Sequence, residues 1–101
     1  MKKILLCCAA GMSTSMLVSK MVDYAKDNNI SVQIDAVGAS EFEEKIAAYQ
    51  CCLLGPQIKY KLTDFSRIAA TDNKPVAVIN TIDYGMMNAE KVLKQALALL
   101  A

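Results

Sequence analysis

The residues best suited to chemistry are two cysteines followed by small and hydroxyl side chains, in the segment CCAAGMSTS at residues 7–15. A loop of this kind, between a strand and the start of a helix, has outward-pointing backbone N–H groups and the positive end of a helix dipole, which together bind anions. The same setting lowers the pKa of a thiol and makes its thiolate a nucleophile. The segment therefore predicts attack on phosphorus through a phosphocysteine, with the loop amides holding the phosphoryl oxygens.

Cys8 is the candidate nucleophile of the four cysteines. We expect a strand over residues 2–7, so that Cys7 is its last residue and packs in the core, whereas Cys8 opens the loop. Cys51 and Cys52 begin a later strand at its far end, and we assign them a structural role. Zinc sites normally show Cys-x2-Cys spacing or histidines, and neither occurs in this sequence, so we expect no metal and no cofactor.

The hydroxyl and methionine side chains of the loop leave alternatives open. Ser13, Thr14 and Ser15 either bind phosphate or cap the following helix, and the two roles are compatible. Met12 is expected at the surface near the cysteine, where an adaptable thioether suits docking of different partners. For Met16 we favour a place in the core, with the same surface position as the alternative.

The sequence lacks the residues that nucleotide-binding loops and histidine-dependent mechanisms require. The Walker pattern Gly-x4-Gly-Lys-Ser/Thr is missing, and Gly11 is the only glycine of the loop, which excludes a dinucleotide fingerprint. The chain has no histidine. Cys-His and Ser-His catalysis are therefore excluded, as is a phosphohistidine on this chain.

Length and composition predict one globular domain over residues 1–101. The sequence is 54% hydrophobic and 21% charged, and its net charge is +1 with no basic cluster beyond Lys2 and Lys3, so we expect no nucleic-acid partner and no direct membrane insertion. No apolar run approaches the roughly 18 residues of a membrane span. The N-terminal apolar stretch is too short for a secretory signal and is better interpreted as a strand, which predicts a cytoplasmic protein.

Hydrophobic periodicity predicts strands alternating with helices. Strands are expected over 2–7, 30–37, 51–55 and 75–80, and helices over 14–28, after a capping box of Ser40 and Glu43, around residues 58–68, and over 89–100. This alternation predicts an α/β fold: an open four-stranded parallel sheet in the order 2-1-3-4 with helices on both faces, flavodoxin-like and phosphatase-like.

The predicted strand order locates a ligand crevice. Strands 1 and 3 are neighbours where the winding reverses, and open α/β sheets bind ligands at the carboxyl ends of the strands at such a point. The loop at 8–15 and the turn Gly55-Pro56-Gln57 both lie at this edge. Gln57 and Tyr84 are candidate rim residues, although a turn or packing role is the favoured interpretation of each.

Residues 8–15, CAAGMSTS, resemble the phosphorylation loop of enzyme IIB of the lactose/cellobiose class, from the bacterial sugar phosphotransferase system. The stretches MLVSKM (16–21), LLGPQIKYKL (53–62), NKPVAVI (73–79) and DYGMMN (83–88) are similar to this family's first helix, third strand with its loop, fourth strand and final turn. The likeness covers nearly the whole chain.

The resemblance implies a phosphotransferase that acts through a phosphocysteine. A phosphohistidine on the IIA partner would pass its phosphoryl group to Cys8, and Cys8 would pass it to a sugar bound in the IIC membrane permease, with which the chain would associate transiently. The phosphate cradle would comprise Ala9, Ala10, Gly11, Met12, Ser13, Thr14 and Ser15. The sugar class implied is cellobiose, diacetylchitobiose or lactose. We expect a monomer. Cys7, where the family often has an apolar residue, leaves reaction with oxidants open.

Two other function classes share parts of this pattern. The Cys-x5 loop also resembles that of tyrosine and low-molecular-weight phosphatases, whose signature is Cys-x5-Arg-Ser/Thr, but Thr14 takes the arginine position. Without the guanidinium we expect negligible phosphatase activity. Asp83 is either a leaving-group acid or, as we favour, a cap of the last helix. A thiol redox or anion-binding module is the third class, but Cys-x-x-Cys is missing and a Cys7–Cys8 disulfide would be strained.

Overall fold

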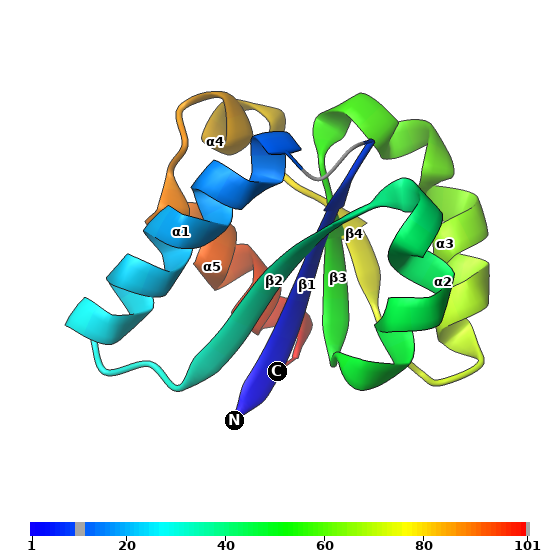
Figure 1. Ribbon diagram of the computed structural model, residues 1–101, viewed down its shortest axis with the longest axis horizontal. Coiled ribbons are helices and arrows are strands. Elements are labelled where there is room, and N and C mark those ends of the chain that lie inside the picture. Colours follow the sequence, from blue (N-terminus) through cyan, green and yellow to red (C-terminus); the bar gives the residue numbers. More distant parts are fainter. Residues whose placement is uncertain (10–11, 101) are drawn as a thin grey trace.

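Four parallel strands form the centre of the fold in the computed structural model, which describes residues 1–9 and 12–100, with the side chains of Met12 and Ser13 left aside. The strands are β1 (Lys2–Cys8), β2 (Val32–Gly38), β3 (Cys51–Leu54) and β4 (Val76–Val78), in the spatial order β2-β1-β3-β4 (Figure 1). This is the order predicted from the alternation of strands and helices.

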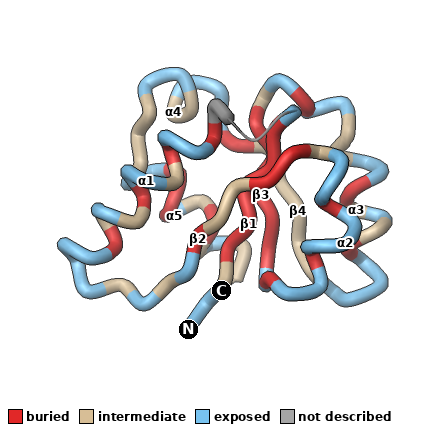
Figure 2. The backbone as a smooth tube through the Cα atoms, viewed as in Figure 1, coloured by how far each residue is buried: buried red, intermediate tan, exposed pale blue. Residues whose placement is uncertain are grey.

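Helices cover both faces of the sheet. On one face lie α1 (Met12–Asp27) and α5 (Ala89–Leu99); on the other lie α2 (Phe42–Lys45) and α3 (Leu62–Ala70) (Figure 1). Short 3-10 turns flank α2 at Ala39–Glu41 and Ile46–Ala48, and another, Pro56–Lys61, precedes α3. Because both faces are covered, β1 is buried from Ile4 to its end (Figure 2).

Alternating residues of β1 contribute to two separate cores. Ile4 and Leu6 pack with α1 and α5, whereas Leu5 and Cys7 pack with α2 and α3. This alternation follows from the period of two along a strand. The sulfur of Cys8 therefore belongs to the α1 side, opposite that of Cys7.

The chain turns earlier after β2 than predicted. The expected capping box of Ser40 and Glu43 is wrong, because β2 ends at Gly38 and a 3-10 turn follows directly. The N–H of Gly38 donates to the Glu41 carboxylate, with 3.2 Å between the nitrogen and Oε2. Ser40 lies within the 3-10 turn that begins at Ala39. Ser40 is therefore not at an N-cap position, because Gly38 precedes the 3-10 turn and Glu41 precedes α2.

A further short helix, α4 (Thr81–Gly85), was not predicted. The Asn80 side chain caps it by accepting from the N–H groups of Ile82 and Asp83, at 3.0 and 3.1 Å. Asn88 caps α5 by accepting from Lys91 N–H at 3.2 Å. The favoured interpretation of Asp83 as the cap of the last helix is therefore wrong, because the two asparagines, which are strong N-cap residues, cap both helices.

None of the helices within residues 1–9 and 12–100 has the length and apolar character needed to span a bilayer.

Candidate functional site

The turn after β3 contacts the end of β1 at the carboxyl edge of the sheet. The N–H of Gly55 donates to the carbonyl oxygen of Cys7, at 2.8 Å. A Cβ atom at position 55 would lie 3.4 Å from Cβ of Cys8 and 2.7 Å from Oε1 of Gln57. A side chain at Gly55 would therefore crowd Gln57 while making ordinary contact with Cys8. Of the loop predicted over residues 8–15, Cys8 lies beside the turn after β3, and Ala10 and Gly11 lie outside the described residues.

Cys8 is the last residue of β1 rather than the first residue of the loop, since it pairs with Gly38 in the strand register. Only 2% of Cys8 is exposed. This is a correction to the prediction of a thiol open at the mouth of the loop. The strand ends one residue later than expected, because Cys8 still pairs with Gly38 of β2.

Thr14, in the first turn of α1, is fully buried and its Oγ1 donates to Sγ of Cys8, with 3.4 Å between the two atoms. Ala9, which follows Cys8, and Ser15, which follows Thr14, are both exposed. Of the remaining predicted cradle residues, Ala10 and Gly11 lie outside the described residues, as do the side chains of Met12 and Ser13.

The other cysteines are buried, reduced thiols. Burial raises the pKa of Cys7 to about 12, with smaller contributions from Cys8 and Glu41, and burial raises that of Cys51 to about 11. The pKa of Cys52 is also raised well above its ordinary value, mainly by burial. These thiols stay protonated at neutral pH and are poor nucleophiles. The predicted core positions of Cys7, Cys51 and Cys52 are confirmed.

The two candidate rim residues meet. Nε2 of Gln57, from the turn after β3, donates to Oη of Tyr84 in α4, at 3.2 Å. Since Oε1 of Gln57 also approaches Gly55, this side chain lies next to Cys8 and the strand end. The structure thus links α4 to the edge that carries Cys8, and the role of both residues as a rim stays a prediction.

The favoured core position of Met16 is wrong. Met16 is 61% exposed, and the large apolar side chains Ile82 and Met86 of the α4 region are exposed as well. Neither Ile82 nor Met86 was predicted as a surface residue from the sequence. The sequence indicated them only as apolar residues of a segment in which no helix was predicted.

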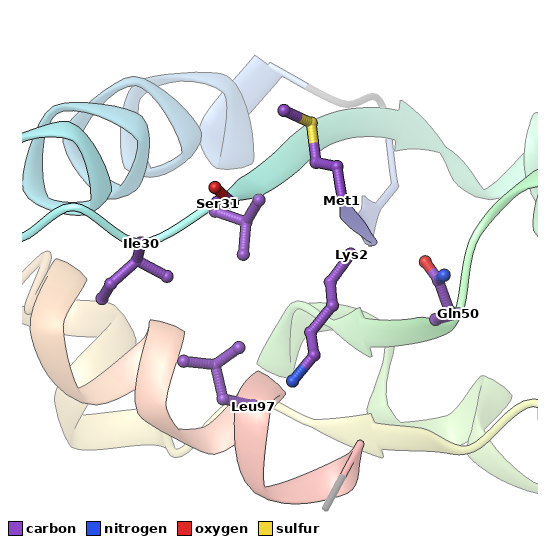
Figure 3. Close-up of a pocket in the computed structure, with 7 residues that line it drawn as sticks. Met1, Lys2, Ile30, Ser31, Gln50 and Leu97 are labelled. Carbon is purple, nitrogen blue, oxygen red and sulfur yellow. The ribbon is translucent and has the colours of Figure 1, made fainter.

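A cavity of about 490 Å³ lies at the opposite, amino-terminal end of the strands. It is lined by Met1, Lys2, Ile30, Ser31, Val32, Gln50 and Leu97 (Figure 3). This lining includes no thiol and no carboxylate side chain, and it is remote from Cys8 along β1. The chemistry predicted for Cys8 therefore does not belong to this cavity.

Comparisons with known proteins agree with this geometry. Residues 3–95 match the family model described as "PTS system, Lactose/Cellobiose specific IIB subunit". The chain is 40% identical over 100 residues to the oligo-beta-mannoside-specific EIIB component of Bacillus subtilis, covering 99% of this chain and 97% of that protein. It is also 40% identical over 100 residues to the cellobiose-specific EIIB component of Lactococcus lactis, covering 94% and 93%.

A solved structure shows the same likeness in three dimensions. The solution structure of a cellobiose-specific phosphotransferase IIB component from Borrelia burgdorferi superposes with a TM-score of 0.81 at 42% sequence identity. The match covers 97% of this chain and 90% of that one. Sequence family and fold therefore point to the same group of proteins.

Proposed function

The chain belongs to the lactose/cellobiose-specific IIB family of the sugar phosphotransferase system, and from this premise we propose that it carries a phosphoryl group on Cys8. Membership makes it a phosphotransferase component of the cellobiose/lactose class. The covalent intermediate, its residue and its partners are the proposal.

The observation that carries the proposal is the position of Cys8. It ends β1 at the edge where β1 and β3 are neighbours and the winding of the sheet reverses, directly before the loop that leads into α1. Open α/β sheets bind ligands at this point, and a helix start favours an anion there. The three other thiols, those of Cys7, Cys51 and Cys52, pack in the two cores, and burial raises their pKa values.

The transfer proceeds in two balanced steps. The thiolate of Cys8 attacks the phosphorus of a phosphohistidine on IIA: the S–P bond forms, the N–P bond breaks, and the imidazole nitrogen keeps the electron pair. A hydroxyl oxygen of the sugar bound in IIC then attacks phosphorus. The O–P bond forms, the hydroxyl proton passes to a base, and the S–P bond breaks with its electron pair on sulfur. Backbone N–H groups of residues 9–15 hold the phosphoryl oxygens in both steps.

The burial of Cys8 favours a carrier over a hydrolase. With 2% of the residue exposed, bulk water has little access to the sulfur. Excluding water protects a reactive intermediate from hydrolysis. The proposal therefore requires that docking of the donor or the acceptor protein uncovers Sγ.

We assign the sugar to the β-linked disaccharides, such as cellobiose, diacetylchitobiose or lactose, and its selection to the IIC permease. Two relatives equally similar to this chain are named for oligo-β-mannoside and for cellobiose. Equal identity to proteins named for different sugars supports a sugar choice made outside the IIB chain.

The test is incubation with phosphorylated IIA followed by intact-mass analysis. We expect the wild-type chain to gain one phosphoryl group and the Cys8→Ser variant to gain none. Cys7→Ala is the matched control, because it removes the adjacent thiol and should still be phosphorylated. Phosphate located on Cys7 or on a hydroxyl side chain would refute the assignment.

A further inference from the structure

We propose that Thr14 is a positioning residue that holds the sulfur of Cys8 and stabilises its negative charge, rather than a side-chain ligand of the phosphoryl oxygens. The inference rests on the proposed function, since it gives a specific part in the same reaction to a residue that sequence patterning grouped with the phosphate cradle.

The burial of Thr14 separates it from the neighbouring hydroxyl. Thr14 is a polar residue with 0% of its surface exposed, whereas Ser15 in the same turn of α1 is exposed. A buried hydroxyl is costly unless it is hydrogen-bonded. Oγ1 of Thr14 meets this need by donating to Sγ of Cys8 at 3.4 Å. The Thr14 hydroxyl thus contacts the sulfur in the interior, whereas Ser15 is an exposed residue.

Both partners of this contact are held by their own elements. The backbone of Cys8 is fixed by strand pairing with Gly38, so its side-chain rotation is the remaining freedom of the sulfur. Thr14 is β-branched and sits in a helix, where rotation about its χ1 angle is restricted. The hydrogen bond therefore joins the end of β1 to the first turn of α1 through the sulfur.

The hydrogen bond is most favourable when the sulfur is anionic. A thiolate accepts hydrogen bonds only, and donation to the charged form favours that form. In transfer to the sugar, the S–P bond breaks and sulfur takes the electron pair, so the Thr14 hydroxyl stabilises charge that develops in the transition state. An interaction that strengthens along the reaction accelerates it. The same donor raises the thiolate fraction available to attack phosphohistidine.

The first test is titration of the thiolate absorbance. Cys7 and Cys51 have pKa values raised to about 12 and about 11, and that of Cys52 is raised well above normal, so none of them ionises appreciably below pH 9. Subtracting the curve of Cys8→Ser then leaves the titration of Cys8. We expect Thr14→Val to raise its midpoint by about one pH unit, as loss of a hydrogen bond to a charged group would.

Conservative and control variants separate this role from packing. Thr14→Ser retains the hydroxyl and should keep the wild-type midpoint. Thr63→Val makes the same chemical change at an exposed position of α3 and should leave the midpoint unchanged. Should Thr14→Val fail to fold by circular dichroism, Thr14→Ala removes the same hydroxyl without the added methyl group. An unchanged midpoint in a folded variant without the hydroxyl would overturn the inference.

The second test is the rate of phosphoryl uptake from phosphorylated IIA against pH. We expect Thr14→Val to be about tenfold slower at pH values below the wild-type midpoint, with the deficit shrinking as rising pH restores the thiolate, in line with a midpoint higher by one pH unit. A wild-type pH profile would contradict the role of Thr14 and leave the phosphocysteine proposal intact. Phosphorylation of Cys8→Ser would instead refute the proposed function itself.

Discussion

Adjacent residues of a strand point to opposite faces of the sheet, and this separates the two neighbouring thiols of β1. Cys7 packs in the core beneath α2 and α3, where burial raises its pKa to about 12. Cys8 faces the α1 side and meets the hydroxyl of Thr14. Two cysteines that are neighbours in the sequence therefore have different roles: Cys7 is a core side chain, and Cys8 is the proposed phosphoryl acceptor.

Protonated core thiols predict a loss of stability at alkaline pH. In the unfolded chain Cys7 ionises near its ordinary value of 9.0, whereas in the folded chain its pKa is about 12. Its stabilising contribution is therefore complete below pH 9 and is lost as pH rises toward 12. Each such thiol lowers the free energy of unfolding by about 1.4 kcal/mol per pH unit in that window.

Urea unfolding at pH 8, 9 and 10 measures this effect. We expect the free energy of unfolding to fall above pH 9 and to fall less steeply in Cys7→Ala, which lacks one of the titrating thiols. Equal slopes for the wild-type chain and Cys7→Ala would show that Cys7 ionises as readily when folded as when unfolded.

At the scale of elements, the site depends on how closely the turn after β3 approaches the end of β1. Gly55 donates to the carbonyl of Cys7, and Gln57, two residues further along, donates to Tyr84 in α4. Three elements, β1, the 3-10 turn Pro56–Lys61 and α4, are therefore connected around Cys8. A side chain at position 55 would disturb this connection at its centre.

Gly55→Ala tests the connection. The new Cβ would lie 2.7 Å from Oε1 of Gln57, an exposed and flexible side chain that can move away, so we expect the protein to fold. We expect Gln57 to leave Tyr84 and phosphoryl uptake from IIA to slow several-fold. A stopped-flow or quench measurement of uptake gives the rate.

Gly85→Ala is the matched control for this substitution. A Cβ at position 85 would meet no atom within 4 Å, and the residue ends α4. Since alanine is the better helix former, we expect stability to rise by up to about 1 kcal/mol with no change of rate. Equal rates for Gly55→Ala and the wild-type chain would show that the Gln57–Tyr84 link has no part in transfer.

At the scale of the whole molecule, the sheet divides the described residues into two cores, and its two ends differ in what they offer. The carboxyl edge carries Cys8, Gln57 and Tyr84, whereas the cavity of about 490 Å³ lies at the amino edge. The exposed side chains of Met16, Ile82 and Met86 belong to α1 and the α4 region. The burial of Cys8, the proposed acceptor, suits delivery of the phosphoryl group by a docked partner protein.

This arrangement predicts negligible turnover of a free aryl phosphate. Thr14 stands where the phosphatase signature has arginine, and its hydroxyl is buried against the sulfur. No guanidinium from this position can stabilise the transition state of hydrolysis. We expect p-nitrophenyl phosphate to be hydrolysed no faster by the wild-type chain than by Cys8→Ser. Steady release of phosphate that disappears in Cys8→Ser would contradict this prediction and show phosphatase activity at Cys8.

The sequence by itself determined the alternation of strands and helices, the strand order and the family. These depend on local hydrophobic periods, on the handedness of crossovers and on the loop motif at 8–15, all of which are readable along the chain. The choice of Cys8 over Cys7 rested on an expected strand end at residue 7, whereas β1 ends at Cys8. Domain extent over 1–101, a monomeric state and the site roles stay predictions.

Only the tertiary structure decided how deeply the sulfur lies and what contacts it. The pairing of Cys8 with Gly38, the hydroxyl of Thr14 on Sγ, and the link between Gln57 and Tyr84 join residues from different elements. Met16 is exposed although its residue type favours the core. Such features depend on how finished elements pack against one another, and local propensity carries no information about that packing.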